Sequence, residues 1–480
     1  MRGILSALHL AGLLFVGVTH GTDMNKHVNV TFTPGSLEML FEEAEMTIVA
    51  TMHSDIQQNI YIQLSPEDGA VVSVTNDTNF LYDTWDTTAK STYTKNVTFT
   101  VRGKFVGKTT LSVLLFNTAD AFKANNNRTV FPSRYKVNVL RNPKALDTIF
   151  TIVVAVSVSI NTIGFGCKLD LDVVKEILKK PVAPVVGLIC QYAGMPMISF
   201  SIAKILKLPN ELALGLFAIG CSPGGGASNI WSLLLDGDVS LSLTMTFISN
   251  VAALGLMPLW LFTLGQVFAT DVTVPYVNII TSLISLVVPG IIGVLIGRFL
   301  PKVAKVIRKC VAPMSLILVL FIITAGVYTN VYMFLLMAKD WRVIIGGVLL
   351  PAVGYVIGCI AAFACCLPWY RVKTIMFETA IQNTGIAIVL LRFSLPQPDA
   401  DLSSVMPVTA TMFTPLPLLF IYIVKKIVGC CCGKPKDEDE DDEEEKEKND
   451  KNDDIEMKSE DEETPKKLPK RLSQVPLTSL

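Results

Sequence analysis

The sequence Cys221-Ser222-Pro223-Gly224-Gly225-Gly226-Ala227-Ser228-Asn229 interrupts an apolar segment of membrane-spanning length. A second apolar segment is interrupted in the same way by Phe377-Glu378-Thr379-Ala380-Ile381-Gln382-Asn383-Thr384-Gly385. Lipid offers no water to free backbone groups, so such breaks persist only inside protein or along a wet cavity. Paired breaks in two halves of a chain indicate the binding site of a transporter.

The composition excludes a single soluble domain. Of the 480 residues, 51% are hydrophobic and only 17% are charged, so most of the chain is expected to lie in a bilayer. The net charge of −1 is close to zero, and no basic domain or nucleic-acid reader motif is present. We therefore expect membrane lipid around the chain and no nucleic-acid partner.

The sequence from about residue 145 predicts an all-α polytopic membrane protein with about nine spans. Each span has close to the ~20 residues needed to cross a bilayer, and the ranges are 146–167, 182–206, 210–235, 239–268, 274–299, 310–330, 342–367, 374–394 and 404–428. Lysine and arginine are concentrated in the loops that this count places inside the cell. We therefore expect an extracellular N-terminus, a cytosolic C-terminus and location in the plasma membrane.

The segment before the spans has a different pattern. Residues 1–21 begin with Arg2 and an apolar run and are predicted to be a cleaved signal peptide, with an uncleaved signal anchor as the alternative. Residues 22–143 consist of short alternating runs, which predict a β-sandwich-like extracellular domain. Because all ten cysteines lie at or beyond Cys167, this domain must fold without disulfides. Four glycosylation sequons fall within it, at Asn29, Asn76, Asn96 and Asn127.

The transmembrane region, predicted at 144–430, is followed by an acidic tail. Residues 431–480 are rich in Asp, Glu and Lys and are expected to be a disordered cytosolic segment. The ending Thr478-Ser479-Leu480 fits a PDZ-type partner that captures the carboxylate of Leu480, or is inert. The cluster Cys430-Cys431-Cys432 is either a palmitoylation site or a plain group of cytosolic thiols.

Glu378 is the deepest carboxylate in any predicted span and therefore needs a partner. All four histidines precede the first span, so the expected partner is a cation from solution. Oxygen-bearing side chains occur in and near the breaks, at Gln191, Ser228, Asn229, Ser242, Thr246 and Gln382. One anionic ligand among neutral oxygens suits sodium better than calcium.

Simpler explanations compete with a cation site. The glycines could serve close helix packing, and Ser242 and Thr246 could bond back to their own helix. Glu378 could reach the inner surface and pair with Lys373. A hydrolase is not expected: Gly220-Cys221-Ser222-Pro223-Gly224 matches a nucleophile elbow, but the required preceding strand and histidine base are missing.

Three segments resemble the bile acid:sodium symporter family, namely 190–196, 220–246 and 378–385. The resemblance implies inverted repeats with two crossing discontinuous helices and two sodium sites. One site would use Ser228, Asn229, Ser242, Thr246 and Glu378, and the other Gln191, Glu378, Gln382 and the carbonyls of Thr379 and Ile381. Substrate would lie beside Pro223, Gly224, Gly225, Gly226 and Asn383. The family implies sodium as the coupling ion and no other cofactor.

The expected function is sodium-coupled symport of an amphipathic organic anion, such as a bile acid or steroid sulfate, by alternating access. Gly226 replaces a threonine common in bile acid carriers, which leaves the cargo open. The alternative is a glycosylated receptor or adhesion scaffold that keeps the transporter body without turnover.

Overall fold

The computed structural model describes residues 28–54, 61–75, 86–89, 92–116, 129–142, 145–169, 171–268, 276–321, 324 and 327–431. The predicted signal peptide, Asn76, Asn127 and the tail from Cys432 to Leu480 lie outside these ranges. The chain divides into two compact units, Met1–Leu416 and Pro417–Leu480.

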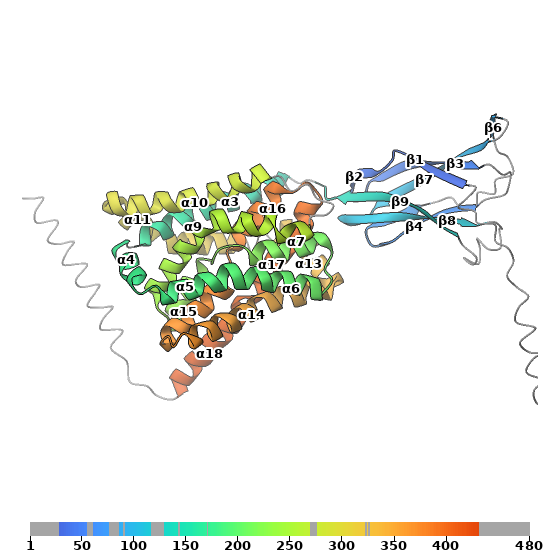
Figure 1. Cartoon of the computed structure of the whole chain (residues 1–480). Helices are drawn as coiled ribbons and strands as arrows, with labels where there is room; N and C mark the ends of the chain where they lie inside the picture. Colours follow the sequence, from blue (N-terminus) through green and yellow to red (C-terminus); the bar gives the residue numbers. More distant parts are fainter. Residues whose placement is uncertain are drawn as a thin grey trace, which may run out of the picture. The chain divides into compact units, whose positions relative to one another are not determined.

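The strand-rich region contains two sheets (Figure 1). One has the order β1-β3-β7-β5, with β6 also paired to β7, and consists of β1 (Val28–Thr33), β3 (Glu45–Ser54), β7 (Thr92–Gly103), β5 (Val72–Thr75) and β6 (Asp86–Ala89). The other has the order β2-β9-β8-β4 and consists of β2 (Leu37–Phe41), β9 (Thr129–Leu140), β8 (Gly107–Phe116) and β4 (Tyr61–Pro66). Only β2 and β9 pair in parallel among these strands.

Both sheets contribute to one hydrophobic core, and along much of β3 and β8 every second residue is buried. Ile48 and Phe99 from the first sheet belong to the same buried cluster as Leu111 from the second. Two sheets over a common core form a sandwich, which agrees with the alternation in the sequence. The sequon asparagines Asn29 and Asn96 are exposed, on β1 and β7.

The remainder of the described chain is helical (Figure 1). The elements are α3 (Ala145–Lys168), α4 (Leu171–Lys179), α5 (Val182–Ile189), the π-helix Cys190–Gly194, α6 (Met195–Ile205), α7 (Asn210–Gly220), α8 (Ala227–Leu234), α9 (Val239–Phe262), the 3₁₀ turn Leu264–Val267, α10 (Tyr276–Phe299), α11 (Pro301–Phe321), α12 (Val327–Thr329), α13 (Val331–Lys339), α14 (Trp341–Ala364), α15 (Trp369–Ala380), α16 (Thr384–Ser394), α17 (Asp399–Phe413) and α18 (Pro415–Cys431). Helix lies in each of the nine predicted ranges.

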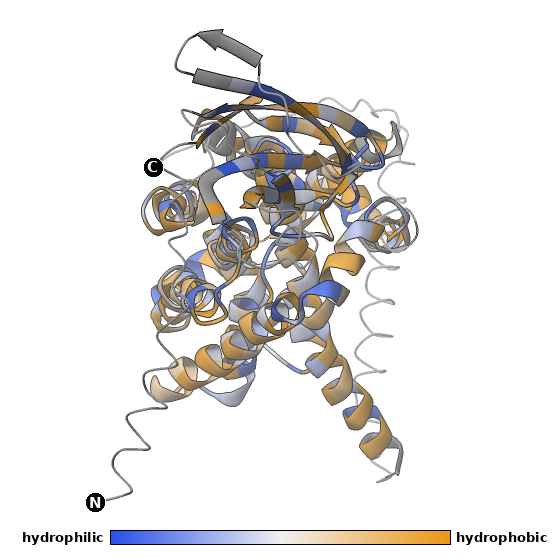
Figure 2. Ribbon diagram, turned by 90° about the vertical axis from the view of Figure 1, so that its right-hand side faces the viewer, coloured by the Kyte–Doolittle hydropathy of each residue, from blue (hydrophilic) through white to orange (hydrophobic). Residues whose placement is uncertain are grey.

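Several of these helices are long and apolar enough to cross a membrane. By length and composition, the described residues contain four such helices, or five if the bent pair formed by α3 and α4 counts as one span. Hydrophobic residues run along the helices in Figure 2, and many large ones, including Ile205, Val277 and Phe363, are exposed. Exposed apolar surface of this extent fits contact with lipid, so this is a multi-pass membrane protein. The count of nine spans and the inverted repeats remain predictions.

The structure narrows both predicted breaks. In the first segment α7 ends at Gly220 and α8 begins at Ala227. In the second, α15 continues through Ala380 and α16 begins at Thr384, so only residues 381–383 are non-helical. Most of the second polar stretch is therefore presented from a helix.

The helix α3 packs mainly against α10 and α11, and glycines bring the first pair together. A Cβ on Gly166 would lie 2.4 Å from the carbonyl oxygen of Gly290, and one on Gly293 would lie 2.2 Å from that of Ile163. The two backbones therefore touch where only glycine fits, as small residues allow in membrane helices. On this basis α3 and α10 form one tightly joined pair.

Candidate functional site

The two breaks meet in space. The amide of Gly225 donates to the carbonyl of Ile381 at 2.8 Å, and the amide of Asn383 donates to the carbonyl of Pro223 at 2.8 Å. Gly224 and Gln382 thus form a short antiparallel bridge. We call Pro223–Gly226 together with Ile381–Asn383 the crossing. Each break satisfies the backbone groups that the other leaves free, which is what lipid requires.

Glycine is needed in the crossing because the approach is close. A Cβ on Gly224 would lie 2.3 Å from Oε1 of Glu378. A Cβ on Gly225 would lie 2.7 Å from the carbonyl oxygen of Gln382. Close helix packing alone does not describe these contacts, because Gly224 faces a carboxylate.

Glu378 lies at the centre of a group of hydroxyls. It is 2% exposed and accepts hydrogen bonds from Ser228 at 2.5 Å and from Thr246 at 2.7 Å. Ser242, one turn before Thr246 on α9, donates to it at 3.3 Å. Ser242 and Thr246 thus share one face of α9, and both point at the acid rather than only back along their helix.

Lys373, the alternative partner for Glu378, has other contacts. Its ammonium donates to the carbonyl of Leu235 and lies 4.0 Å from the carboxylate of Asp236. The hydrogen bonds that surround Glu378 come from neutral hydroxyls on α8 and α9.

Asn229 adds an unpaired oxygen next to this group. Its Nδ2 donates to the carbonyl of Gly226 at 3.2 Å, while its buried Oδ1 has no hydrogen-bond partner among the described residues. A buried carbonyl oxygen without a partner is unfavourable and calls for an explanation. A cation held by Asn229 and the neighbouring acid would supply one.

The second predicted set of ligands also comes together. Gln191 lies in the π-helix and donates to Oε1 of Gln382 and to the carbonyl of Ser222, both at 2.6 Å. Gln382 donates to the carbonyl of Thr379 at 2.7 Å, while the carbonyl of Ile381 takes part in the bridge. A π-helix inside an α-helical segment frequently marks a functional position.

A small cavity lies beside Gln191 and Glu378. Its volume is about 10 Å³, and its lining includes Gln191, Ser249 and Glu378. This is about the space that one water or small ion occupies.

Ser249 was missed by the sequence analysis. Its hydroxyl accepts from the amide of Gly224 at 3.2 Å and donates to the carbonyl of Thr246 at 3.0 Å. The signal was present, because positions 242, 246 and 249 follow the spacing of one helix face.

The buried acids Asp399 and Asp401 were missed as well, because the span was predicted to begin at 404 and α17 begins at Asp399.

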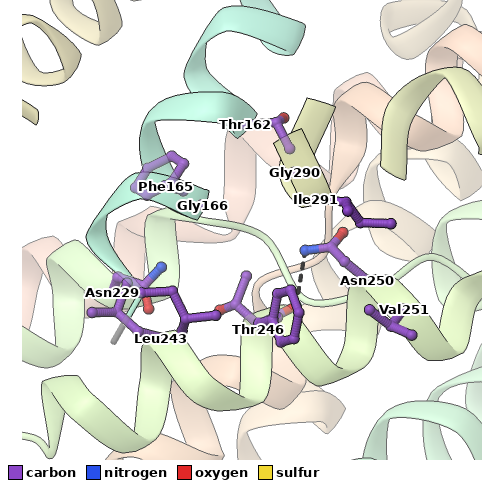
Figure 3. Close-up of a pocket in the computed structure, with 12 residues that line it drawn as sticks. Thr162, Phe165, Gly166, Asn229, Leu243, Thr246, Asn250, Val251, Gly290 and Ile291 are labelled. Carbon is purple, nitrogen blue, oxygen red and sulfur yellow. Dashed lines mark hydrogen bonds between the residues drawn. The ribbon is translucent and has the colours of Figure 1, made fainter. Parts of the chain in front are cut away.

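A larger cavity of about 50 Å³ adjoins the site, and we call it the seam cavity. Figure 3 shows α3 and α10 on one side of it and α8 and α9 on the other. Asn229 and Thr246 line it, and Asn250 donates to the carbonyl of Thr246 at 2.8 Å. Most of its lining is apolar.

The predicted substrate residues occupy different positions. Pro223, Gly224 and Gly225 lie inside the crossing, and Gly226, at its edge, faces Phe165, which lines the seam cavity. The side chain of Asn383 caps α16 by accepting from the amide of Ile386.

Broken helices that meet at a buried acid, in a chain of membrane-length helices, are typical of the fold of secondary transporters. The family model described as Sodium Bile acid symporter family matches residues 155–339. The human ileal sodium/bile acid cotransporter is 33% identical over 270 residues, which cover 56% of this chain and 76% of that protein. The chain belongs to the sodium bile acid symporter family.

Other relatives resemble the same region. The mouse P3 protein is 36% identical over 252 residues, or 52% of each chain. A bovine sodium-dependent organic anion transporter is 32% identical over 251 residues, which cover 52% of this chain and 66% of that protein. The chain spans about half the length of the P3 proteins it matches.

Proposed function

We propose that this protein couples the movement of sodium to that of an amphipathic organic anion, by alternating access. The observation that carries the proposal is the buried carboxylate of Glu378, which is surrounded by neutral oxygen groups at the crossing. An ionised acid inside a membrane domain is unfavourable without a counter-charge. A sodium ion supplies that charge.

The first sodium ion would be held by Ser228, Asn229, Ser242, Thr246 and Glu378. The orphaned Oδ1 of Asn229 supports this set, because a cation would satisfy it. On binding, the three hydroxyls would turn so that their lone pairs face the ion and their protons face away.

The second sodium ion would be held by Gln191, Glu378, Gln382 and the carbonyls of Thr379 and Ile381. The small cavity beside Gln191 and Glu378 supports this assignment, and Ser249 on its wall adds a further oxygen. Hard oxygen ligands of this kind suit an alkali cation, and the carbonyls of Thr379 and Ile381 would turn from their present hydrogen bonds toward the ion.

The organic anion would occupy the seam cavity, with a bile acid or a steroid sulfate as the substrate class to test. The apolar lining suits a hydrophobic body, and Asn229 and Thr246 connect this cavity to the proposed sodium site. The names of two relatives, a sodium/bile acid cotransporter and an organic anion transporter, point to the same chemistry.

Alternating access would come from relative movement of the helices on the two sides of the seam cavity. The joined helices α3 and α10 would form part of one group, and the helices that carry the crossing would form part of the other.

The exposed sequon asparagines Asn29 and Asn96 support an extracellular, glycosylated 22–143 region after a signal peptide at 1–21. A cytosolic tail at 431–480 and location in the plasma membrane complete the proposed arrangement.

The experiment is sodium-gradient uptake of bile acids and steroid sulfates into proteoliposomes containing the wild type, Glu378→Gln or Glu176→Gln. The control Glu176→Gln removes an exposed carboxylate on α4. We expect Glu378→Gln to abolish sodium-driven uptake and Glu176→Gln to retain it. Unchanged sodium dependence in Glu378→Gln would overturn the proposal, and a wild type without any sodium response would favour the scaffold alternative.

A further inference from the structure

One face of α3 is turned toward the crossing. Val158, Thr162 and Phe165 follow the spacing of four and three residues that places them on one side of the helix, and Leu169, directly after its last residue, continues this spacing. A Cβ on Gly385, near the start of α16, would lie 3.5 Å from Val158. Gly226, at the start of α8, faces Phe165 two turns further along. The same face of α3 thus touches the beginning of both broken half-helices.

Space, and not backbone conformation, explains the glycine at 226. Its φ of −57° and ψ of −15° are open to every residue type. A Cβ there would lie 2.9 Å and 3.1 Å from two ring atoms of Phe165. The aromatic ring therefore occupies the volume that a side chain at 226 would need.

The backbone that carries Phe165 cannot easily withdraw. The adjacent Gly166 is in backbone contact with α10, as described above, and Arg308 of α11 donates to the carbonyl of Cys167 at 2.7 Å. Room beside the ring is therefore gained by rotating the side chain, or by moving α3 together with α10. The Lys168 ammonium, 5.9 Å from the ring centroid, is a further neighbour of the ring.

The seam cavity is small for the expected cargo. Its volume is about 50 Å³, whereas sites for drug-sized ligands enclose roughly 300–1,000 Å³. Phe165 lines this cavity together with the proposed sodium ligands Asn229 and Thr246 (Figure 3). Its ring is therefore placed to limit the width of any apolar body next to the sodium site.

We propose that Phe165 is a specificity-determining residue, which sets the size of the organic anion that can lie between α3 and the crossing. This inference rests on the proposed symport function. A slim anion, with an alkyl chain beside its charged group, fits with the ring in place. A fused-ring steroid anion fits only if the Phe165 side chain moves away from its position against Gly226.

The test compares sodium-driven uptake of hexyl sulfate and taurocholate by the wild type, Phe165→Ala and Leu169→Ala. Leu169, the first residue after α3, lines the same cavity and serves as the matched control, because it lies one turn away from Phe165 and its contact with Gly226. We expect Phe165→Ala to raise the ratio of taurocholate to hexyl sulfate uptake by roughly tenfold or more. Leu169→Ala should change that ratio by less than about threefold.

A double mutant tests the contact itself. Gly226→Ala should reduce uptake of taurocholate more than that of hexyl sulfate, and adding Phe165→Ala should restore it, because the ring no longer opposes the new methyl group. Equal ratios in the wild type and Phe165→Ala, or equal changes in Phe165→Ala and Leu169→Ala, would overturn the inference.

A second measurement, the rise in Tm that sodium is expected to cause, separates this inference from the proposed function. If Phe165→Ala keeps that rise and the uptake ratio does not change, the sodium site stands and only the role of Phe165 fails. Failure of every protein to take up either anion, with the sodium response intact, would overturn the assignment of the seam cavity to organic anions. Loss of the sodium response in the wild type would overturn the proposed function itself.

Discussion

At the scale of single residues, the site is organised around one acid. Glu378 accepts hydrogen bonds from Ser228, Ser242 and Thr246, which belong to two different helices. These hydroxyls satisfy the buried carboxylate with hydrogen bonds, and in the proposed sodium-bound state they would rotate so that a lone pair faces the ion. These residues were predicted because they lie in or near the first break, whereas Ser249 on the same face of α9 was not predicted.

Removing one hydroxyl should weaken sodium binding without abolishing it. Ser242→Ala loses a buried oxygen next to a charged group, a contact worth about 1.5 kcal/mol, so we expect roughly tenfold lower sodium affinity. The measurement is the sodium concentration that gives half of the maximal rise in Tm. Ser240→Ala removes an exposed hydroxyl from the same helix and should match the wild type. Equal affinities in the two variants would contradict the role of Ser242.

A methyl group at Gly224 should damage the site by contact alone. Its Cβ would meet Oε1 of Glu378 at 2.3 Å, so Gly224→Ala must displace the carboxylate or separate the crossing. We expect a lower Tm by several degrees and loss of the sodium response. Gly255→Ala is the control, because its Cβ meets nothing within 4 Å and alanine favours helix. A sodium response in Gly224→Ala equal to that of the wild type would exclude this geometry.

At the scale of elements, the sequence located the breaks but not their extent. Proline and adjacent glycines end α7, as expected from their backbone preferences. The helical course of Phe377–Ala380 was not evident, because polar residues in a span fit either a break or a buried helix. The hydrogen bond between Gly225 and Ile381 is a tertiary contact between positions far apart in the chain, which no local pattern encodes.

The π-helix and the start of α17 show the same limit. The sequence Cys190–Gly194 gives no local reason for a wider turn, whereas in the folded protein Gln191 donates to both Ser222 and Gln382. The acids Asp399 and Asp401 read as a loop in sequence but lie in the first turn of a helix, where negative charge is favourable.

The start of α14 carries a pH-dependent contribution to stability. Asp340 lies outside the membrane-spanning segments and accepts hydrogen bonds from Arg342, which lower the pKa of its carboxyl group. A lowered pKa in the folded state means that the charge stabilises the fold above the ordinary pKa of about 3.9 and ceases to do so as pH falls through the folded value.

The variant Asp340→Asn keeps a capping side chain but loses the charge. We expect it to be less stable than the wild type at pH 7 by about 1 kcal/mol, and the difference in Tm to shrink as pH falls below about 4. Tm measured in detergent across this range checks both parts. A difference that is constant with pH would show that the charge of Asp340 contributes nothing.

At the scale of the whole molecule, transport would depend on coupled binding of sodium and the organic anion at the crossing. Sodium should order the two breaks against each other, and the ordered crossing should bind the organic anion more tightly. The coupling is reciprocal, so substrate must raise sodium affinity by the same factor, with about 1–3 kcal/mol as the usual range. The seam cavity is placed for this, because Asn229 and Thr246 face both ligands in the proposed arrangement.

The most direct test of the central claim is the Tm of the purified full-length protein in sodium chloride compared with potassium chloride at equal ionic strength. A ligand that binds only the folded state at about 100 times its Kd stabilises it by roughly 2.7 kcal/mol. We expect a higher Tm in sodium than in potassium for the wild type and for Glu176→Gln, and no difference for Glu378→Gln. Equal Tm values for the wild type in the two salts, or the same sodium response in Glu378→Gln, would contradict that claim.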